Sequence, residues 1–103
     1  NPGEKLVLEE ECSEVKLGCG ILSLTNQRII FEKTEGNLTT LNKKMGNVLL
    51  NTTLDKVDRV NSEGFILTKV VVEISDSKYK FSVFSSKNWA KEIEAQKRLF
   101  KNQ

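Results

Sequence analysis

The side chains that most often carry out catalysis are sparse in this chain of 103 residues. There is no histidine, which removes the commonest general base and the Ser–His and Cys–His pairs that activate a nucleophile. Glu9, Glu10 and Glu11 are three consecutive carboxylates. If they lie on a strand, neighbours point to opposite faces, so we interpret them as a solvated stretch and not as an acid–base pair. We expect a protein that is not an enzyme.

The two cysteines, Cys12 and Cys19, do not make a recognisable metal or disulfide motif. A structural zinc site takes four cysteine or histidine ligands, and a disulfide framework needs more thiols. We expect free cysteines, although a bridge stays open if the strands that they flank pair. Gly18-Cys19-Gly20 lacks the lysine and the helix of a phosphate-binding loop. No cofactor and no metal is expected.

The charge balance and the hydropathy restrict the partners. The net charge of +2 is too small to argue for nucleic acid, and no apolar run approaches the roughly 20 residues of a membrane span. Two thiols without a framework favour a reducing compartment. We therefore expect a cytoplasmic location, or a peripheral one at a membrane surface, with no nucleic acid and no transmembrane segment.

The elements that must position any binding residues are mostly short strands. Alternating apolar residues and intervening turn formers predict seven of them, followed by an apolar stripe at helical spacing. The expected strands are approximately 5–17, 20–25, 28–33, 48–53, 57–62, 69–75 and 78–84, and the helix is approximately 86–101. The prediction is a mainly β single domain over residues 1–103, a seven-stranded bent barrel or sandwich capped by a C-terminal amphipathic α-helix.

The first hairpin gives the sharpest expectations for the core. Leu22 and Leu24 share one face of a strand, and Ile29 and Phe31 share one face of the next, so all four are expected to point inward. Thr25 and Asn26 lie between these strands, and we expect their side chains to shape the turn. On the helix, Trp89 and Ile93 share the apolar stripe and are interpreted as core residues.

The stretch Gly20-Ile21-Leu22-Ser23-Leu24-Thr25-Asn26-Gln27-Arg28-Ile29-Ile30-Phe31 resembles the hairpin of GRAM domains and related prokaryotic pleckstrin-homology-like domains. Pro2-Gly3-Glu4-Lys5 is similar to the start of that family, and Leu54 to Val60 resembles its later turn and strand. The resemblance implies a pleckstrin-homology-like (PH-like) fold and a binding module. It follows the chain in the order of its elements and is most specific in the hairpin.

The resemblance also implies a place for a ligand. PH-like domains that bind phosphoinositides carry a lysine at the end of the first strand and an Arg/Lys-x-Arg motif in the second, at the open end of the barrel. Lys16 matches the first position, but residues 21–25 contain no basic side chain. The lysines expected near that end, hereafter the lysine rim, are Lys16, Lys33, Lys43, Lys44, Lys78 and Lys80.

Two functions stay open at this level. The missing motif favours a protein-interaction or scaffolding domain that binds a protein or peptide partner. The alternative is a membrane-surface module in which the lysine rim binds anionic lipid headgroups weakly, since each lysine near an anionic surface contributes about 1 kcal/mol. The oligomeric state is not predicted.

Overall fold

The computed structural model describes residues 2–34 and 44–102, and only the backbone of residues 44–46. The connection between the expected strands 28–33 and 48–53, which contains Lys43, therefore lies largely outside the described residues. The elements are β1 Leu6–Glu14, β2 Gly18–Thr25, β3 Arg28–Thr34, β4 Lys44–Thr53, a 3₁₀ turn η1 Leu54–Lys56, β5 Val57–Glu63, β6 Lys69–Ile74, β7 Ser77–Ser82 and α1 Ser86–Lys101.

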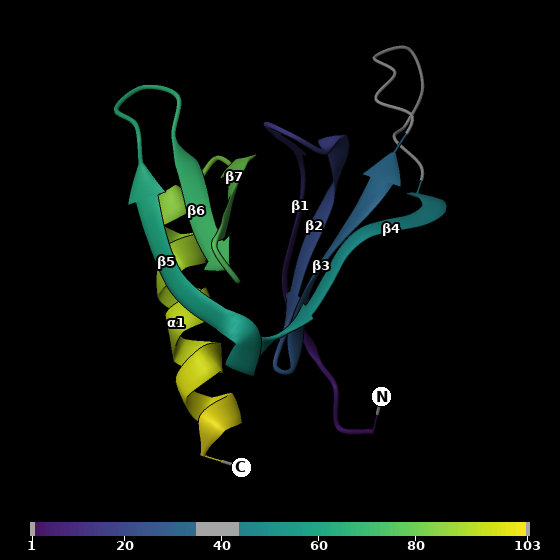
Figure 1. Cartoon of the computed structure of the whole chain (residues 1–103), viewed down its shortest axis with the longest axis vertical. Helices are drawn as coiled ribbons and strands as arrows, with labels where there is room; N and C mark the ends of the chain where they lie inside the picture. Colours follow the sequence, from purple (N-terminus) through teal and green to yellow (C-terminus); the bar gives the residue numbers. More distant parts are fainter. Residues whose placement is uncertain (1, 35–43, 103) are drawn as a thin grey trace.

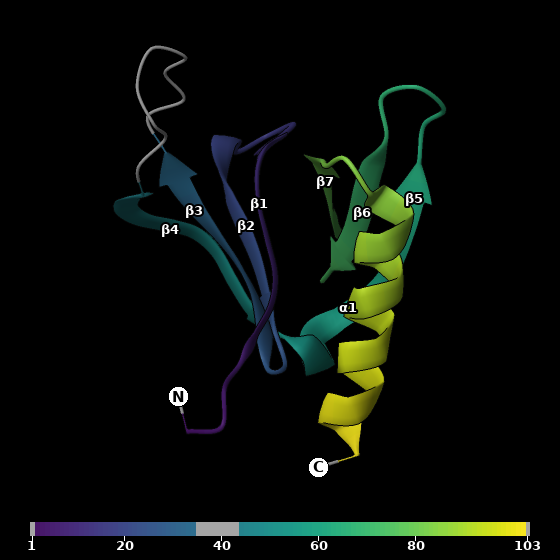
Figure 2. The ribbon, with the colours of Figure 1, turned by 180° about the vertical axis from the view of Figure 1, so that it is seen from behind.

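The seven strands form one antiparallel sheet in the order β4-β3-β2-β1-β7-β6-β5. The sheet bends sharply between β1 and β7, so that β1–β4 and β5–β7 face each other as two halves (Figure 1). The pair Glu14–Phe81 joins the halves. Helix α1 packs on β5, β6 and η1, as the view from behind shows (Figure 2). The predicted class of seven strands and one C-terminal helix is confirmed.

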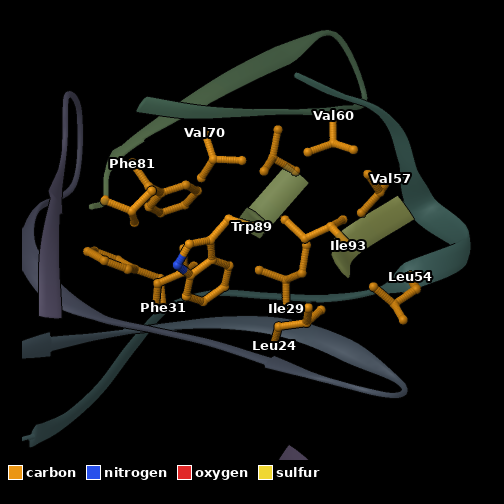
Figure 3. Close-up of a cluster of buried hydrophobic side chains, with 13 residues drawn as sticks. Leu24, Ile29, Phe31, Leu54, Val57, Val60, Val70, Phe81, Trp89 and Ile93 are labelled. Carbon is orange, nitrogen blue, oxygen red and sulfur yellow. The ribbon is translucent and has the colours of Figure 1, made fainter. Parts of the chain in front are cut away.

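The core fills the space between the two halves and the helix (Figure 3). Leu22, Leu24, Ile29 and Phe31 are fully buried, as the hairpin pattern predicts. The rings of Phe31 and Phe81 meet at 5.2 Å between centroids and are tilted by 54°, an arrangement that aromatic pairs favour. Trp89 is 2% exposed and belongs to the same cluster of buried side chains as Phe31 (Figure 3). The interpretation of Trp89 as a core residue is confirmed.

The β2–β3 turn is built by the side chains expected to build it. The Thr25 hydroxyl oxygen accepts the backbone N–H groups of Gln27 and Arg28, each at 3.0 Å. Asn26 Oδ1 accepts from the backbone N–H of Lys5 at 2.8 Å, and its Nδ2 donates to the carbonyl of Gly3 at 3.0 Å. The turn therefore also fastens the segment that precedes β1.

β1 is shorter than the expected strand 5–17, and the reason is Glu14. Glu14 is only 3% exposed, and its carboxylate accepts the backbone N–H groups of Lys16 at 2.6 Å, Leu17 at 2.9 Å and Lys80 at 2.8 Å. Three N–H donors satisfy a carboxylate that burial would otherwise penalise. Glu14 thus ends β1, closes the β1–β2 turn and attaches that turn to β7, leaving Val15 exposed on the turn.

The second hairpin turns at Ser75 and Asp76. Both residues have positive φ, 47° and 68°, as a two-residue turn between antiparallel strands requires. The Ser75 backbone N–H donates to Asp58 Oδ2 at 3.0 Å. β7 then ends at Ser82, two residues before the expected end of the strand 78–84, so that Phe84 lies in the connection to α1.

Candidate binding surface

Four large apolar side chains stand in solvent at one end of the barrel. Phe65, Ile66 and Leu67 occupy the β5–β6 connection and are 96%, 86% and 84% exposed, and Phe84 in the β7–α1 connection is 94% exposed. We call these four residues the apolar loop patch. The β5–β6 connection projects beyond its strands, at the top of Figure 1. Contiguous exposed apolar surface of this kind marks an interaction site in soluble proteins.

Gly64 sets the conformation of the β5–β6 connection. Its φ is +95°, and a Cβ at this position would collide with the backbone carbonyl oxygen of Leu67. Only glycine fits both the positive φ and this close approach of backbone to backbone. Thr68 Oγ1 then donates to the carbonyl of Val83 at 3.1 Å. The connection is therefore tied at its base to the chain just before Phe84, while residues 65–67 face outward.

Phe84 is fixed through its backbone and not through its ring. Its N–H donates to Glu10 Oε2 at 2.8 Å, and Glu10 Oε1 accepts from the indole Nε1–H of Trp89 at 3.0 Å. Glu10 thus links β1, the β7–α1 connection and α1. The interpretation of residues 9–11 as a merely solvated stretch is wrong for Glu10, because its carboxylate accepts both of these donors and the side chain is partly buried, like those of Leu8 and Cys12 on the same face of β1.

The surface beside the patch is hollowed on both sides of Phe84. A hollow of about 500 Å³ is lined by Ile66, Leu67, Val83 and Phe84 together with polar residues that include Glu10, Glu11 and Lys69. A second hollow of about 460 Å³ is lined by Phe65 and Phe84 with the polar residues of the first turn of α1. Both hollows are lined by Thr68 and Phe84, so the two loops form one continuous surface.

The charges around the patch are of both signs. Glu63 at the end of β5 forms an ion pair with Lys80, with Nζ and Oε2 3.1 Å apart. Lys69 follows the loop directly and Lys87 lies in the first turn of α1. Neither lysine side chain makes a hydrogen bond or an ion pair with another residue in the described part of the chain. Two cationic groups therefore border an apolar tip.

The two cysteines are free. Their strands do pair, but Cys12 is opposite Gly20 while Cys19 is opposite Ser13. Because residues directly opposite share a face and neighbours alternate, Cys12 and Cys19 point to opposite faces of the sheet. Burial raises the pKa of the Cys12 thiol to about 12, with the Glu10 carboxylate adding to the effect, whereas Cys19 is exposed.

Residues 2–34 and 44–102 contain no group of three or more histidine, cysteine, aspartate or glutamate side chains placed to hold a metal ion. Over the same ranges, no helix has the length and the apolar character that crossing a membrane requires.

No family model and no curated relative matches this sequence. Solved structures do match it, and one of them is the Vps36 N-terminal PH domain, with a TM-score of 0.72 and 19% sequence identity over 100% of this chain and 86% of that one. At this identity the likeness concerns the fold. The fold is PH-like. The fold that the hairpin residues implied is thereby confirmed, whereas a GRAM-specific relationship is not addressed by the match.

The lysine rim of this PH-like domain is spread over several elements. Lys16 lies on the β1–β2 turn, with its Nζ 5.0 Å from the centroid of the Tyr79 ring. Lys33 is near the end of β3, and Lys78 lies opposite Glu73 in the register of β6 and β7, beside their turn. Glu14 holds the backbone N–H groups of Lys16 and Lys80 together. Lys43 and the side chain of Lys44 lie outside the described residues, so lipid binding at this rim stays a prediction.

The apolar loop patch was not predicted from the sequence. Phe65-Ile66-Leu67 falls between the expected strands 57–62 and 69–75, where only the turn-forming Gly64 stands out. A signal was present, since three large apolar residues in succession do not alternate and directly follow a glycine. Apolar residues in a loop are exposed unless another element covers them, and the sequence does not show which element that would be.

Proposed function

We propose that this PH-like domain is a non-catalytic binding module that docks its protein onto a partner through the apolar loop patch. A single observation carries the proposal: Phe65, Ile66, Leu67 and Phe84 are each at least 84% exposed, on two connections that share two hollows. Fully burying one such side chain yields about 1.5–3 kcal/mol. The four together supply ample free energy for association.

The structural surroundings support docking and not chemistry as the role of this face. The polar groups nearest the patch serve the fold: Glu10 holds Trp89 and the Phe84 backbone, Thr68 holds Val83, and Lys80 pairs with Glu63. The GRAM-type relationship suggested by the hairpin, and a location at the surface of a membrane or of a larger assembly, belong to the same proposal.

Site-specific photo-crosslinking in the cells that produce the protein tests this function without presuming the partner. A photoreactive phenylalanine analogue replaces Phe65 in one variant and Phe84 in another, and a matched control carries it at Leu99 on the last turn of α1. Leu99 is also apolar and is 58% exposed. We expect adducts from positions 65 and 84 and few from position 99. Equal yields at the three positions, or none at 65 and 84, would overturn the proposal.

A further inference from the structure

We infer that the partner of the apolar loop patch is a lipid bilayer, with the tip of the β5–β6 connection and the Phe84 ring inserted into the interfacial region. This inference depends on the proposed docking function and names its partner. We identify the partner from three observations: the way in which the patch is exposed, its position on projecting loops, and the charges that border it.

The exposure pattern favours immersion over contact with one flat face. Phe65, Ile66 and Leu67 are successive residues, and all three are nearly fully exposed. The backbone of Gly64 closely approaches the Leu67 carbonyl, so the three apolar residues lie on a tight turn. A flat protein surface would cover one side of the tip and leave the rest in water. The interfacial layer of a bilayer surrounds a tip that enters it by roughly 5–10 Å.

The second loop extends the inserted region without any rearrangement. Phe84 is held at its backbone by Glu10 while its ring is free in solvent. Phe65 and Phe84 line the same hollow. The two connections therefore present their apolar side chains together, so a bilayer that accommodates the β5–β6 connection also accommodates the Phe84 ring.

The bordering charges match the level of the lipid headgroups. Lys69 directly follows Leu67 and Thr68, and Lys87 lies three residues after Phe84, so both sit at the base of the apolar tip. Lysine side chains can extend toward lipid phosphates while their stems lie along apolar groups. Glu63 is neutralised by Lys80. Glu10 and Glu11 face the same hollow as Lys69 and offset part of its charge, so attraction to anionic lipid contributes modestly beside apolar insertion.

These features predict a specific response to salt and to composition. Insertion of apolar side chains is not screened by salt, whereas adsorption through exposed lysines is. We expect binding to neutral phosphatidylcholine vesicles, an increase of a few-fold when phosphatidylserine is added, and loss of only that increase at high salt. Adsorption through the lysine rim alone would give no binding to neutral vesicles.

Co-flotation of the chain with vesicles tests the inference. The patch variant F65S/I66S/L67S should lose more than about tenfold in partition coefficient, because each change removes a large apolar side chain, and F84S should lose several-fold. The control L6S/L99S removes two apolar residues that are 59% and 58% exposed elsewhere on the surface; it should bind like the wild type. Thermal unfolding followed by circular dichroism verifies that each variant is folded.

Three results would overturn the bilayer assignment. They are equal partition of the patch variant and the wild type, equal losses in the patch and control variants, and no partition of the wild type into either kind of vesicle. If the crosslinks at positions 65 and 84 then identify a protein, the docking function is supported and the assignment of a bilayer as the partner is rejected. If those positions give no adduct at all, the docking function is rejected as well.

Discussion

The carboxylate of Glu10 in β1 accepts the indole Nε1–H of Trp89 in α1 at 3.0 Å. The same carboxylate receives the backbone N–H of Phe84 at 2.8 Å through its other oxygen. One side chain of β1 therefore fixes both the helix and the connection that carries part of the apolar loop patch. This links the stability of the fold to the geometry of its binding face.

A double-mutant cycle tests this link. Glu10→Ala leaves the two donors without their acceptor, and Trp89→Phe leaves the carboxylate without the indole, each at a cost of about 1–3 kcal/mol beyond any packing loss. Because both changes remove the same bond, we expect a coupling free energy of about 0.5–3 kcal/mol. Urea unfolding followed by circular dichroism measures it. Additive losses would show that the bond contributes nothing.

Gly20 should tolerate no side chain, because the Phe31 ring and the Glu32 backbone both lie too close to it. A Cβ at position 20 would lie 2.6 Å from the Phe31 Cζ and 2.6 Å from the Glu32 carbonyl oxygen. We expect Gly20→Ala to reduce the free energy of unfolding by about 1–3 kcal/mol, as overpacking does. Adding Phe31→Leu should relieve part of the clash, so the double variant should lose less than the sum of the single losses. A sum that is exactly additive would argue against contact with the ring.

The lowered pKa of Glu4 predicts that the stability of the fold decreases in acid. Hydrogen bonds from Arg28 and Thr25 lower the pKa of Glu4 from 4.5 to about 2 in the folded chain, with Arg28 Nε 2.8 Å from Oε2. The unfolded chain therefore takes up the proton first as the pH falls. The stabilisation is complete above pH 4.5 and is lost progressively toward pH 2. Stability measured between these values should fall more steeply for the wild type than for Glu4→Gln, and parallel curves would contradict the assignment.

The two thiols should differ in reactivity. The thiolate is the nucleophile, and a pKa of about 12 keeps Cys12 protonated at neutral pH in a half-buried position, while Cys19 is exposed. Brief alkylation of the native chain with iodoacetamide should modify Cys19 alone, and both residues should react in urea. Peptide mass spectrometry locates the label. Native labelling of Cys12 at the rate of Cys19 would show that β1 is not packed as described.

Much of the fold could be predicted because local pattern and burial agree. The alternation of Leu22 and Leu24, and of Ile29 and Phe31, gives one register in which all four are buried, and shifting by one residue would expose them. The stripe of Trp89 and Ile93 likewise has one apolar face. These assignments depend on neighbours in the sequence, which a single sequence shows.

The candidate site could not be predicted to the same extent, because it depends on contacts between distant residues. Glu10 finds its donors 74 and 79 positions away, and Glu14 finds one of its donors 66 positions away. The expected strand 5–17 also runs past the end of β1. Cys12 and Glu14 still face inward, whereas Val15 lies on the turn and is 68% exposed. The exposure of the apolar loop patch likewise depends on where distant elements lie, which neighbouring residues in the sequence do not show.

Fluorescence of a tryptophan placed at the tip tests the central claim most directly. In the variant Phe65→Trp/Trp89→Phe, the new indole reports only on position 65, and Leu99→Trp/Trp89→Phe provides the matched control. With phosphatidylcholine vesicles we expect the emission of the tryptophan at position 65 to shift to the blue and to be quenched by lipids brominated near the headgroup. The control should keep its aqueous spectrum. An unshifted and unquenched spectrum from position 65, in a variant shown to be folded, would contradict insertion of the apolar loop patch.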